Sequence, residues 1–156
     1  MDLTNLILHA YDDVRELTTE ELQILISDII DIDEIPFAIS ELYKRDSKSA
    51  ILLGEKILEN NLGDEYLQAA IFDFFFEKNK QYITKYIVKH LEQMDLYVFA
   101  NMINRLTEEA VQQYGQNIPG QLLSSIASRY MLYSEKEKNR IEDKFNLFLA
   151  AYNGRI

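Results

Sequence analysis

Apolar residues recur three and four positions apart along nearly the whole chain, the spacing that places side chains on one face of an α-helix. No run of four or more residues alternates cleanly between apolar and polar, as a half-buried strand would. The pattern predicts an all-α fold of eight to ten short antiparallel helices. The clearest apolar stripe belongs to a helix that we expect to run from about Glu20 to Asp31. Its members are Leu22, Leu25, Ile26, Ile29 and Ile30.

Local signals mark where several of these helices begin. Thr18 is followed three residues later by Glu21, and Ser134 by Glu137. This is the spacing of a capping box, in which each side chain bonds the other residue's backbone N–H. Pro36 suits the first turn of a helix, where its missing N–H costs no hydrogen bond. The sequence therefore predicts helix starts at these three places.

A weak internal repeat of about thirty residues follows from the helix starts at Glu34, Asp64 and Asp95, the first of which is the start that Pro36 also marks. Apolar residues stand three and eight positions after each start. They are Phe37, Leu67, Val98, Leu42, Phe72 and Ile103. A helix–turn–helix repeat of this length is typical of an α-solenoid of stacked, HEAT-like hairpins. An ordinary antiparallel bundle of similar helices would show the same spacing, so both architectures stay open.

Length and composition narrow the class of protein. The 156 residues predict one domain, residues 1–156, which is long enough to bury a core. The absence of cysteine excludes disulfides and thiolate metal sites. Five glycines and two prolines supply too few turns for an all-β fold. The N-terminus lacks the basic and apolar regions of a secretory signal. We therefore expect a soluble cytoplasmic protein with no membrane association.

Negative charge is concentrated at the start of the chain. Residues 1–34 hold ten acids against Arg15 alone, a net −9 of the total −10. A field this one-sided steers basic partners and repels nucleic acid. Acidic residues are also common in solvated helix turns, so a surface without a partner remains the alternative. The candidate partner-binding residues are Asp12, Asp13, Glu16, Glu20, Glu21, Asp28, Asp31, Asp33 and Glu34.

Signals of catalysis are missing from the sequence. The two histidines, His9 and His90, lie far apart, and neither has an acid at metal-ligand spacing. No Gly-rich phosphate loop or Gly-x-Ser-x-Gly elbow is present. We expect His90 to flank the packing face of a helix that includes Tyr86. The sequence predicts no enzyme activity, no catalytic residues, no metal site and no cofactor.

Asp73 is the one carboxylate set among aromatic residues, with phenylalanine at four of the five positions 72–76. A helix covered on most sides could desolvate Asp73, and a buried carboxylate needs a partner. The alternative, which we favour, is that Asp73 shares an exposed face with Tyr66 and Glu77.

Two segments, Asp64–Phe72 and Asp95–Phe99, carry a resemblance to a known group of proteins. Within the region from Ile35 to about Ala110, the chain resembles the helical immunity proteins of bacterial contact-dependent growth-inhibition and polymorphic toxin systems. The resemblance implies a cytoplasmic antitoxin that binds one cognate toxin domain, often a nuclease, and blocks its active site. It supplies no catalytic residues.

These observations predict a protein-binding inhibitor whose acidic residues cover the basic cleft of a toxin. The second possibility is a helical-repeat adaptor without inhibitory function, which binds a protein or peptide. Direct nucleic-acid binding is disfavoured because no basic patch is apparent and phosphate contacts dominate that affinity.

Overall fold

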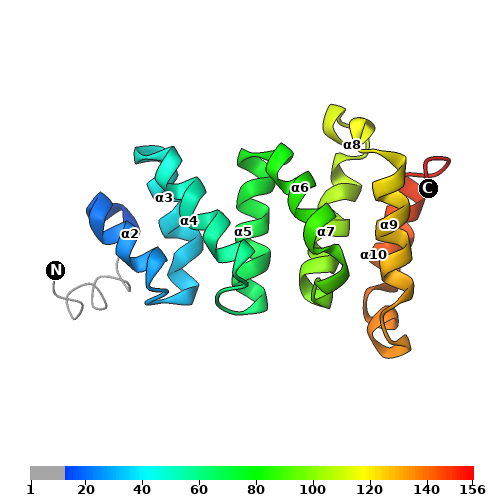
Figure 1. Ribbon diagram of the computed structural model, residues 1–156, viewed down its shortest axis with the longest axis horizontal. Helices are drawn as coiled ribbons and strands as arrows, with labels where there is room; N and C mark the ends of the chain where they lie inside the picture. The colour runs from blue at the N-terminus through cyan, green and yellow to red at the C-terminus, as the bar shows by residue number, and fades with distance from the viewer. Residues whose placement is uncertain (1–12) are drawn as a thin grey trace. The chain divides into compact units, whose positions relative to one another are not determined.

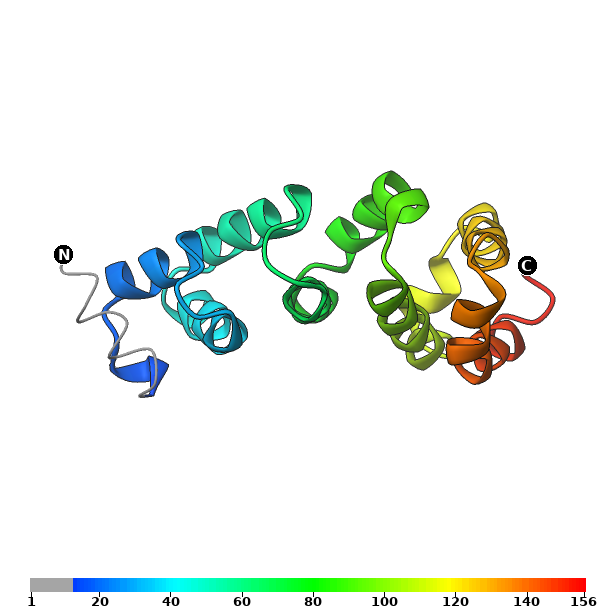
Figure 2. The ribbon, with the colours of Figure 1, turned by 90° about the horizontal axis from the view of Figure 1, so that it is seen from below.

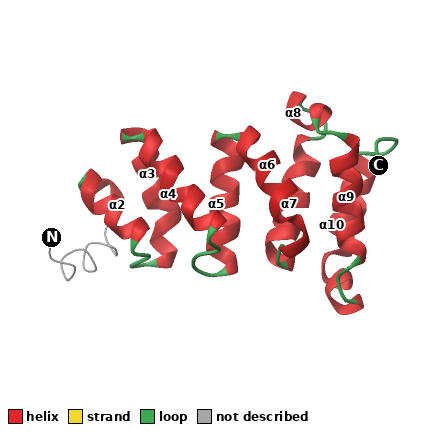
Figure 3. Cartoon of the chain, viewed as in Figure 1, coloured by secondary structure: helices red, strands yellow, loops and turns green. Residues whose placement is uncertain are grey.

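The computed structural model describes residues 13–156, and within them it contains helices and no strands (Figures 1 and 3). The all-α prediction is confirmed. The nine α-helices of this part are α2 (Thr19–Ser27), α3 (Ile35–Arg45), α4 (Ser47–Glu59), α5 (Glu65–Lys78), α6 (Lys80–His90), α7 (Leu96–Glu109), α8 (Gln113–Asn117), α9 (Gly120–Met131) and α10 (Glu135–Ala151). Three short 3-10 helices accompany them: η1 (Val14–Glu16), η2 (Ile32–Glu34) and η3 (Leu91–Gln93).

The helices form two compact units, Met1–Lys78 and Asn79–Ile156. In the described part of the N-terminal unit, α2 and α4 lie in one row and α3 and α5 in the other (Figure 2). In the C-terminal unit, α6 and α9 form one row while α7 and α10 form the other. Stacked hairpins and an antiparallel bundle both bury apolar side chains between two rows of helices. Both architectures therefore fit each unit.

Aromatic packing fills the core of the N-terminal unit. Phe72, Phe75 and Phe76 of α5 are fully buried, with Phe74 set edge-on to Phe75 at 5.3 Å between ring centroids. Gly54 of α4 lets the two helices approach closely, because a Cβ there would stand 2.8 Å from the Phe75 ring. The close approach therefore depends on a residue without a side chain.

The C-terminal unit packs α7 against α10 most extensively. The Tyr130 and Phe145 rings stack with centroids 3.7 Å apart, which joins α9 to α10. The hydroxyl of Tyr133 donates to the carbonyl of Met94 at 2.6 Å. Tyr152, which is buried, donates to the carbonyl of Leu106. Tyrosine hydroxyls thus bond backbone carbonyls inside this core.

The predicted capping signals are present in the structure. Thr18 with Glu21 and Ser134 with Glu137 each form a complete capping box. Pro36 lies in the first turn of α3. Each hydrogen bond from the cap side chain of these two capping boxes satisfies a backbone N–H that the first helical turn leaves without an internal acceptor. The boundaries of these helices are therefore local properties of the sequence.

The three starts of the proposed repeat also hold. Helices α3, α5 and α7 begin directly after Glu34, Asp64 and Asp95. Only the Asp64 carboxylate caps its helix, accepting from the Leu67 N–H at 2.8 Å. Five of the six apolar repeat positions are buried, while Phe37 is 64% exposed. The expectation that Phe37 matches its two repeat partners is therefore wrong at the level of packing.

Among the described residues, none of the helices combines the length and the apolar character that crossing a membrane requires.

Candidate functional site

The acidic segment folds as three short elements, η1, α2 and η2, and some of its carboxylates shape those elements. Asp13 accepts a hydrogen bond from the Arg15 N–H at 2.9 Å and so caps η1. Asp31 caps η2 in the same way, accepting from the Asp33 N–H at 3.1 Å. Glu21 completes the capping box of α2. These three residues of the predicted site therefore have a structural role that needs no partner.

The helix predicted from Glu20 to Asp31 ends earlier, at Ser27. The Ile30 N–H donates to the Leu25 carbonyl at 3.3 Å, which closes the helix with the pairing of a Schellman motif. Ile29 occupies the left-handed position of that motif, with φ +48°. The motif usually takes glycine at this position, so Ile29 gives no sequence signal that the helix ends here. Asp31 consequently lies beyond α2, in the connection to η2.

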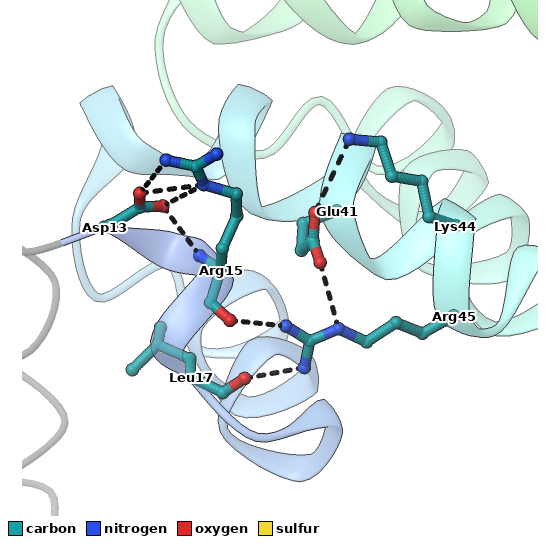
Figure 4. A network of polar contacts seen from close by, with 6 residues as sticks. All are labelled: Asp13, Arg15, Leu17, Glu41, Lys44 and Arg45. Atoms are coloured by element: carbon teal, nitrogen blue, oxygen red, sulfur yellow. Dashed lines mark hydrogen bonds and ion pairs between the residues drawn. The ribbon is translucent and has the colours of Figure 1, made fainter.

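Arg45 of α3 holds η1 and the residues that follow it (Figure 4). Its guanidinium donates to the carbonyl of Leu17 at 2.6 Å and to that of Arg15 at 2.9 Å. It also pairs with Glu41 one turn earlier, at 3.1 Å. A single side chain therefore fixes the backbone that leads into the acidic segment.

The guanidinium of Arg15 is bonded to the Asp13 carboxylate. This hydrogen bond is the main reason that the pKa of Asp13 falls to about 2. The same pairing raises the pKa of Arg15. Arg15, the one base of residues 1–34, is therefore paired with Asp13.

Besides Asp13, four described members of the predicted site are exposed carboxylates: Glu16, Glu20, Asp28 and Asp33. Beneath them the apolar side chains of the segment are buried, with Leu22, Leu25 and Ile26 wholly inaccessible. Ile29 and Ile30, predicted as part of this stripe, are only partly buried. The segregation of charge from the core, which the helical pattern predicted, holds for α2 itself.

Glu34 shows that some of these charges act on one another. Its pKa is raised, first by partial burial and then by the negative charges of Asp31, Asp33 and Asp13. Glu34 stands at the N-cap position of α3 without a capping hydrogen bond from its side chain. The structure thus brings four of the predicted residues into one electrostatic cluster. Asp12, also predicted, lies outside the described residues.

Residues 13–156 contain no group of three or more histidine, cysteine, aspartate or glutamate side chains placed to hold a metal ion. His90 stacks on Tyr86, with ring centroids 4.5 Å apart, so the predicted place beside a packing face is confirmed. His9 lies outside the described part. Asp73 is partly exposed between the exposed Tyr66 and Glu77, as we favoured.

A hollow in the C-terminal unit, with a volume of about 570 Å³, was not predicted from the sequence. Lys80 lies on its wall, where its ammonium group pairs with Glu109 at 3.1 Å and stands 5.7 Å from the Tyr114 ring. The Tyr114 hydroxyl is hydrogen-bonded to Thr84 at 2.7 Å. These residues come from three helices, and no local spacing in the sequence relates them.

Comparison of the chain with protein-family models, with curated proteins and with solved structures found no match.

Proposed function

We propose that this chain is an immunity-type protein, which neutralises a bacterial toxin domain by covering the toxin's basic active-site cleft. The observation that carries the proposal is the group of exposed carboxylates Glu16, Glu20, Asp28 and Asp33. Arg15 is paired with Asp13, and Arg45, which lies beside this segment, is paired with Glu41 and bonded to backbone carbonyls, so both bases are occupied by other groups.

The pKa of Glu34 is raised first by burial and then by the negative charges of Asp31, Asp33 and Asp13, and like charges at this spacing disfavour the folded state. A basic partner would offset that repulsion. Complementary charge raises association rates and discriminates against wrong partners more than it sets affinity. A nuclease toxin fits this chemistry because its substrate cleft must attract phosphate. The toxin is the proposed partner, with neither nucleic acid nor membrane as a ligand, and inhibition would occur in the cytoplasm.

The test begins with the whole chain as bait in its source cell, followed by mass spectrometry and then by kinetics with the recovered toxin domain. Reversing Glu16, Glu20, Asp28 and Asp33 to lysine should slow association at least tenfold at low salt. The matched control reverses four other exposed acids: Glu65, Glu135, Glu142 and Asp143. Equal slowing in both variants, or a salt dependence that the first reversal leaves intact, contradicts the proposal.

The second candidate function is a helical-repeat adaptor that inhibits nothing. It is favoured by a series of hollows on the C-terminal unit, which an extended ligand could occupy. Recovery of several unrelated proteins by the bait, with no toxin among them, would support the adaptor and count against the inhibitor.

A further inference from the structure

Three hollows on the C-terminal unit join into one groove between α6 and α9. The first and second, about 320 and 340 Å³, share Thr84 and Pro119. The second and third, the latter about 330 Å³, share Leu91 and Ser125. The groove therefore follows α6 from Gln81 to the start of η3. At about 1.5 Å of rise per residue, this distance accommodates roughly five extended residues or three helical turns of a ligand.

The centre of the groove is apolar and open to solvent. Val88, on its wall, is 67% exposed, although it lies between helices that bury most of their apolar side chains. Leu91, Leu122 and Pro119 complete the apolar part. The α9 wall continues with small hydroxyl residues, and Ser125 bonds its own helix through the Gln121 carbonyl at 2.9 Å. A ligand would therefore contact an apolar surface that is bordered on the α9 side by short serine side chains.

The charged side chains on the lining of the groove are Lys85, Arg129 and Glu92. Helix α6 contains three lysines and α9 one arginine, and neither contains an acid, in a chain of net charge −10. Lys85 lies on the groove itself, and Lys89 follows one turn later. Arg129 lies at the far end, where it donates to the Leu91 carbonyl at 3.1 Å. The acid on the lining is Glu92 of η3, at that same end.

An apolar centre with Lys85 beside it suits a ligand that combines apolar side chains with negative charge. We propose that this groove binds an acidic peptide segment of a partner protein, with apolar residues against Val88 and Leu122 and a carboxylate toward Lys85. The inference does not rest on the proposed function, which uses acidic residues of the other unit to bind a basic surface.

The test selects peptides from a random library of 12-residue sequences displayed on phage, with the full chain immobilised. Enriched peptides should be acidic and carry at least two apolar residues. Val88→Asp places a carboxylate at the open centre and should weaken their binding at least tenfold. Lys85→Glu should weaken it several-fold. Val111→Asp is the matched control, because Val111 is 79% exposed and lies outside the groove.

Absence of enrichment, enrichment of basic peptides, or unchanged binding to the Val88→Asp variant would overturn the proposal. So would a dimer of the chain, seen by sedimentation, that Val88→Asp dissociates, because the occupant would then be a second copy. Reversal of Glu16, Glu20, Asp28 and Asp33 to lysine should not weaken the binding of these peptides. The groove and the acidic segment can therefore fail independently.

Discussion

The two units differ in how they use their charged residues. Residues 1–78 carry 18 acids and six bases, a net −12, whereas residues 79–156 carry eight acids and ten bases, a net +2. In the C-terminal unit both Arg129 and Arg155 bond backbone carbonyls, Arg155 reaching that of Gly115 at 2.8 Å. In the described part of the N-terminal unit some exposed acids, such as Asp13 and Asp64, cap helices, whereas Glu16 and Glu20 are exposed without a capping role. Formal charge therefore overstates the positive charge that the C-terminal unit presents to solvent, and it also counts acids of the N-terminal unit that serve as caps.

The cores of the two units also differ in the polar groups that they bury. Tyr133 and Tyr152 bond carbonyls inside the C-terminal unit. In the described part of the N-terminal unit, Gln68 is the buried polar residue, and its amide donates to the carbonyls of Ile57 at 3.0 Å and Leu62 at 2.6 Å. Both units bury an apolar core, and the C-terminal core adds hydroxyl–carbonyl bonds where the described N-terminal core has the amide of Gln68.

The largest effect should come from the apolar core of the N-terminal unit. Phe75→Ala removes a fully buried ring that packs against Phe74 and Gly54, and should lower the free energy of unfolding by about 3–5 kcal/mol. Urea unfolding measures this loss. Phe37→Ala is the matched control, because Phe37 is mostly exposed, and it should change stability by less than about 0.5 kcal/mol. Similar losses in the two variants would remove the apolar half of the comparison.

Removal of the buried hydroxyls should have the next largest effect. Tyr152→Phe leaves the Leu106 carbonyl without its tyrosine donor, at a cost of about 1–3 kcal/mol. Tyr133→Phe should cost less, because the Met94 carbonyl still accepts from the Arg129 guanidinium at 3.3 Å. Tyr97→Phe is the control, since Tyr97 is 45% exposed. Thermal unfolding followed by circular dichroism measures all three. Unchanged stability of both core variants would show that these hydrogen bonds do not distinguish the units.

The same hydroxyls predict a dependence on alkaline pH. Burial raises the pKa of Tyr133 and of Tyr152 to about 12 from an ordinary value of 10.0. Above pH 10 the unfolded chain loses these protons more readily than the folded chain, so stability should fall as pH rises from 10 to 12. The double phenylalanine variant should show a shallower fall over that interval, measured by urea unfolding at each pH. Parallel profiles would refute the assignment.

A third effect compares two ends of helices within the N-terminal unit. Helix α4 closes with the same motif as α2, because the Leu62 N–H donates to the Ile57 carbonyl at 3.0 Å. Its left-handed residue is Asn61, with φ +50°, where α2 has Ile29. A β-branched residue is strained in this conformation by about 1–2 kcal/mol.

Exchanging these residues should therefore have opposite results. Asn61→Ile should lower the free energy of unfolding by about 1–2 kcal/mol, and Ile29→Asn should raise it by about 1 kcal/mol. Chemical denaturation of both variants, with Asn60→Ile beside Asn61 as the control, measures the difference. A loss of stability in both exchanged variants would mean that packing of Ile29 outweighs its backbone strain.

The smallest global effect should come from Arg45. Arg45→Ala removes two bonds to carbonyls and should cost about 1 kcal/mol, because the side chain is partly exposed. The change should appear mainly as faster amide hydrogen exchange in residues 13–17. Lys44→Ala is the control, since Lys44 is exposed and its distance to Glu41 is 3.6 Å. Protection that survives in the Arg45 variant would contradict the role assigned to this side chain.

The features that the sequence predicted well depend on neighbouring residues. The capping boxes at Thr18 and Ser134 join groups three residues apart, and the apolar stripe of α2 reflects helical periodicity. Phe37 shows the limit of a repeat, because its position relative to the helix start matched Leu67 while its environment did not. Local pattern predicts which face is apolar, and only packing decides whether a given residue on it is covered.

The candidate site was predictable in its composition and only partly in its geometry. Glu16 and Glu20 are exposed, as expected, whereas Asp13 and Asp31 serve as caps. The bonds from Arg45 to the carbonyls of residues 15 and 17 span 30 and 28 positions, and backbone acceptors leave no trace in side-chain identity. The groove between α6 and α9 depends likewise on distant residues that three-dimensional packing brings together.

The acceptors used by Arg45 have a consequence for how this protein could change over generations. Main-chain carbonyls are the same whatever side chains residues 15 and 17 carry. The hydrogen bonds from Arg45 therefore do not depend on the identity of the exposed side chains around them. Positions such as Glu16 could be replaced while the backbone that presents them stays in place. A backbone held by Arg45 in this way would let new binding specificities arise by substitution of exposed side chains, without a new fold.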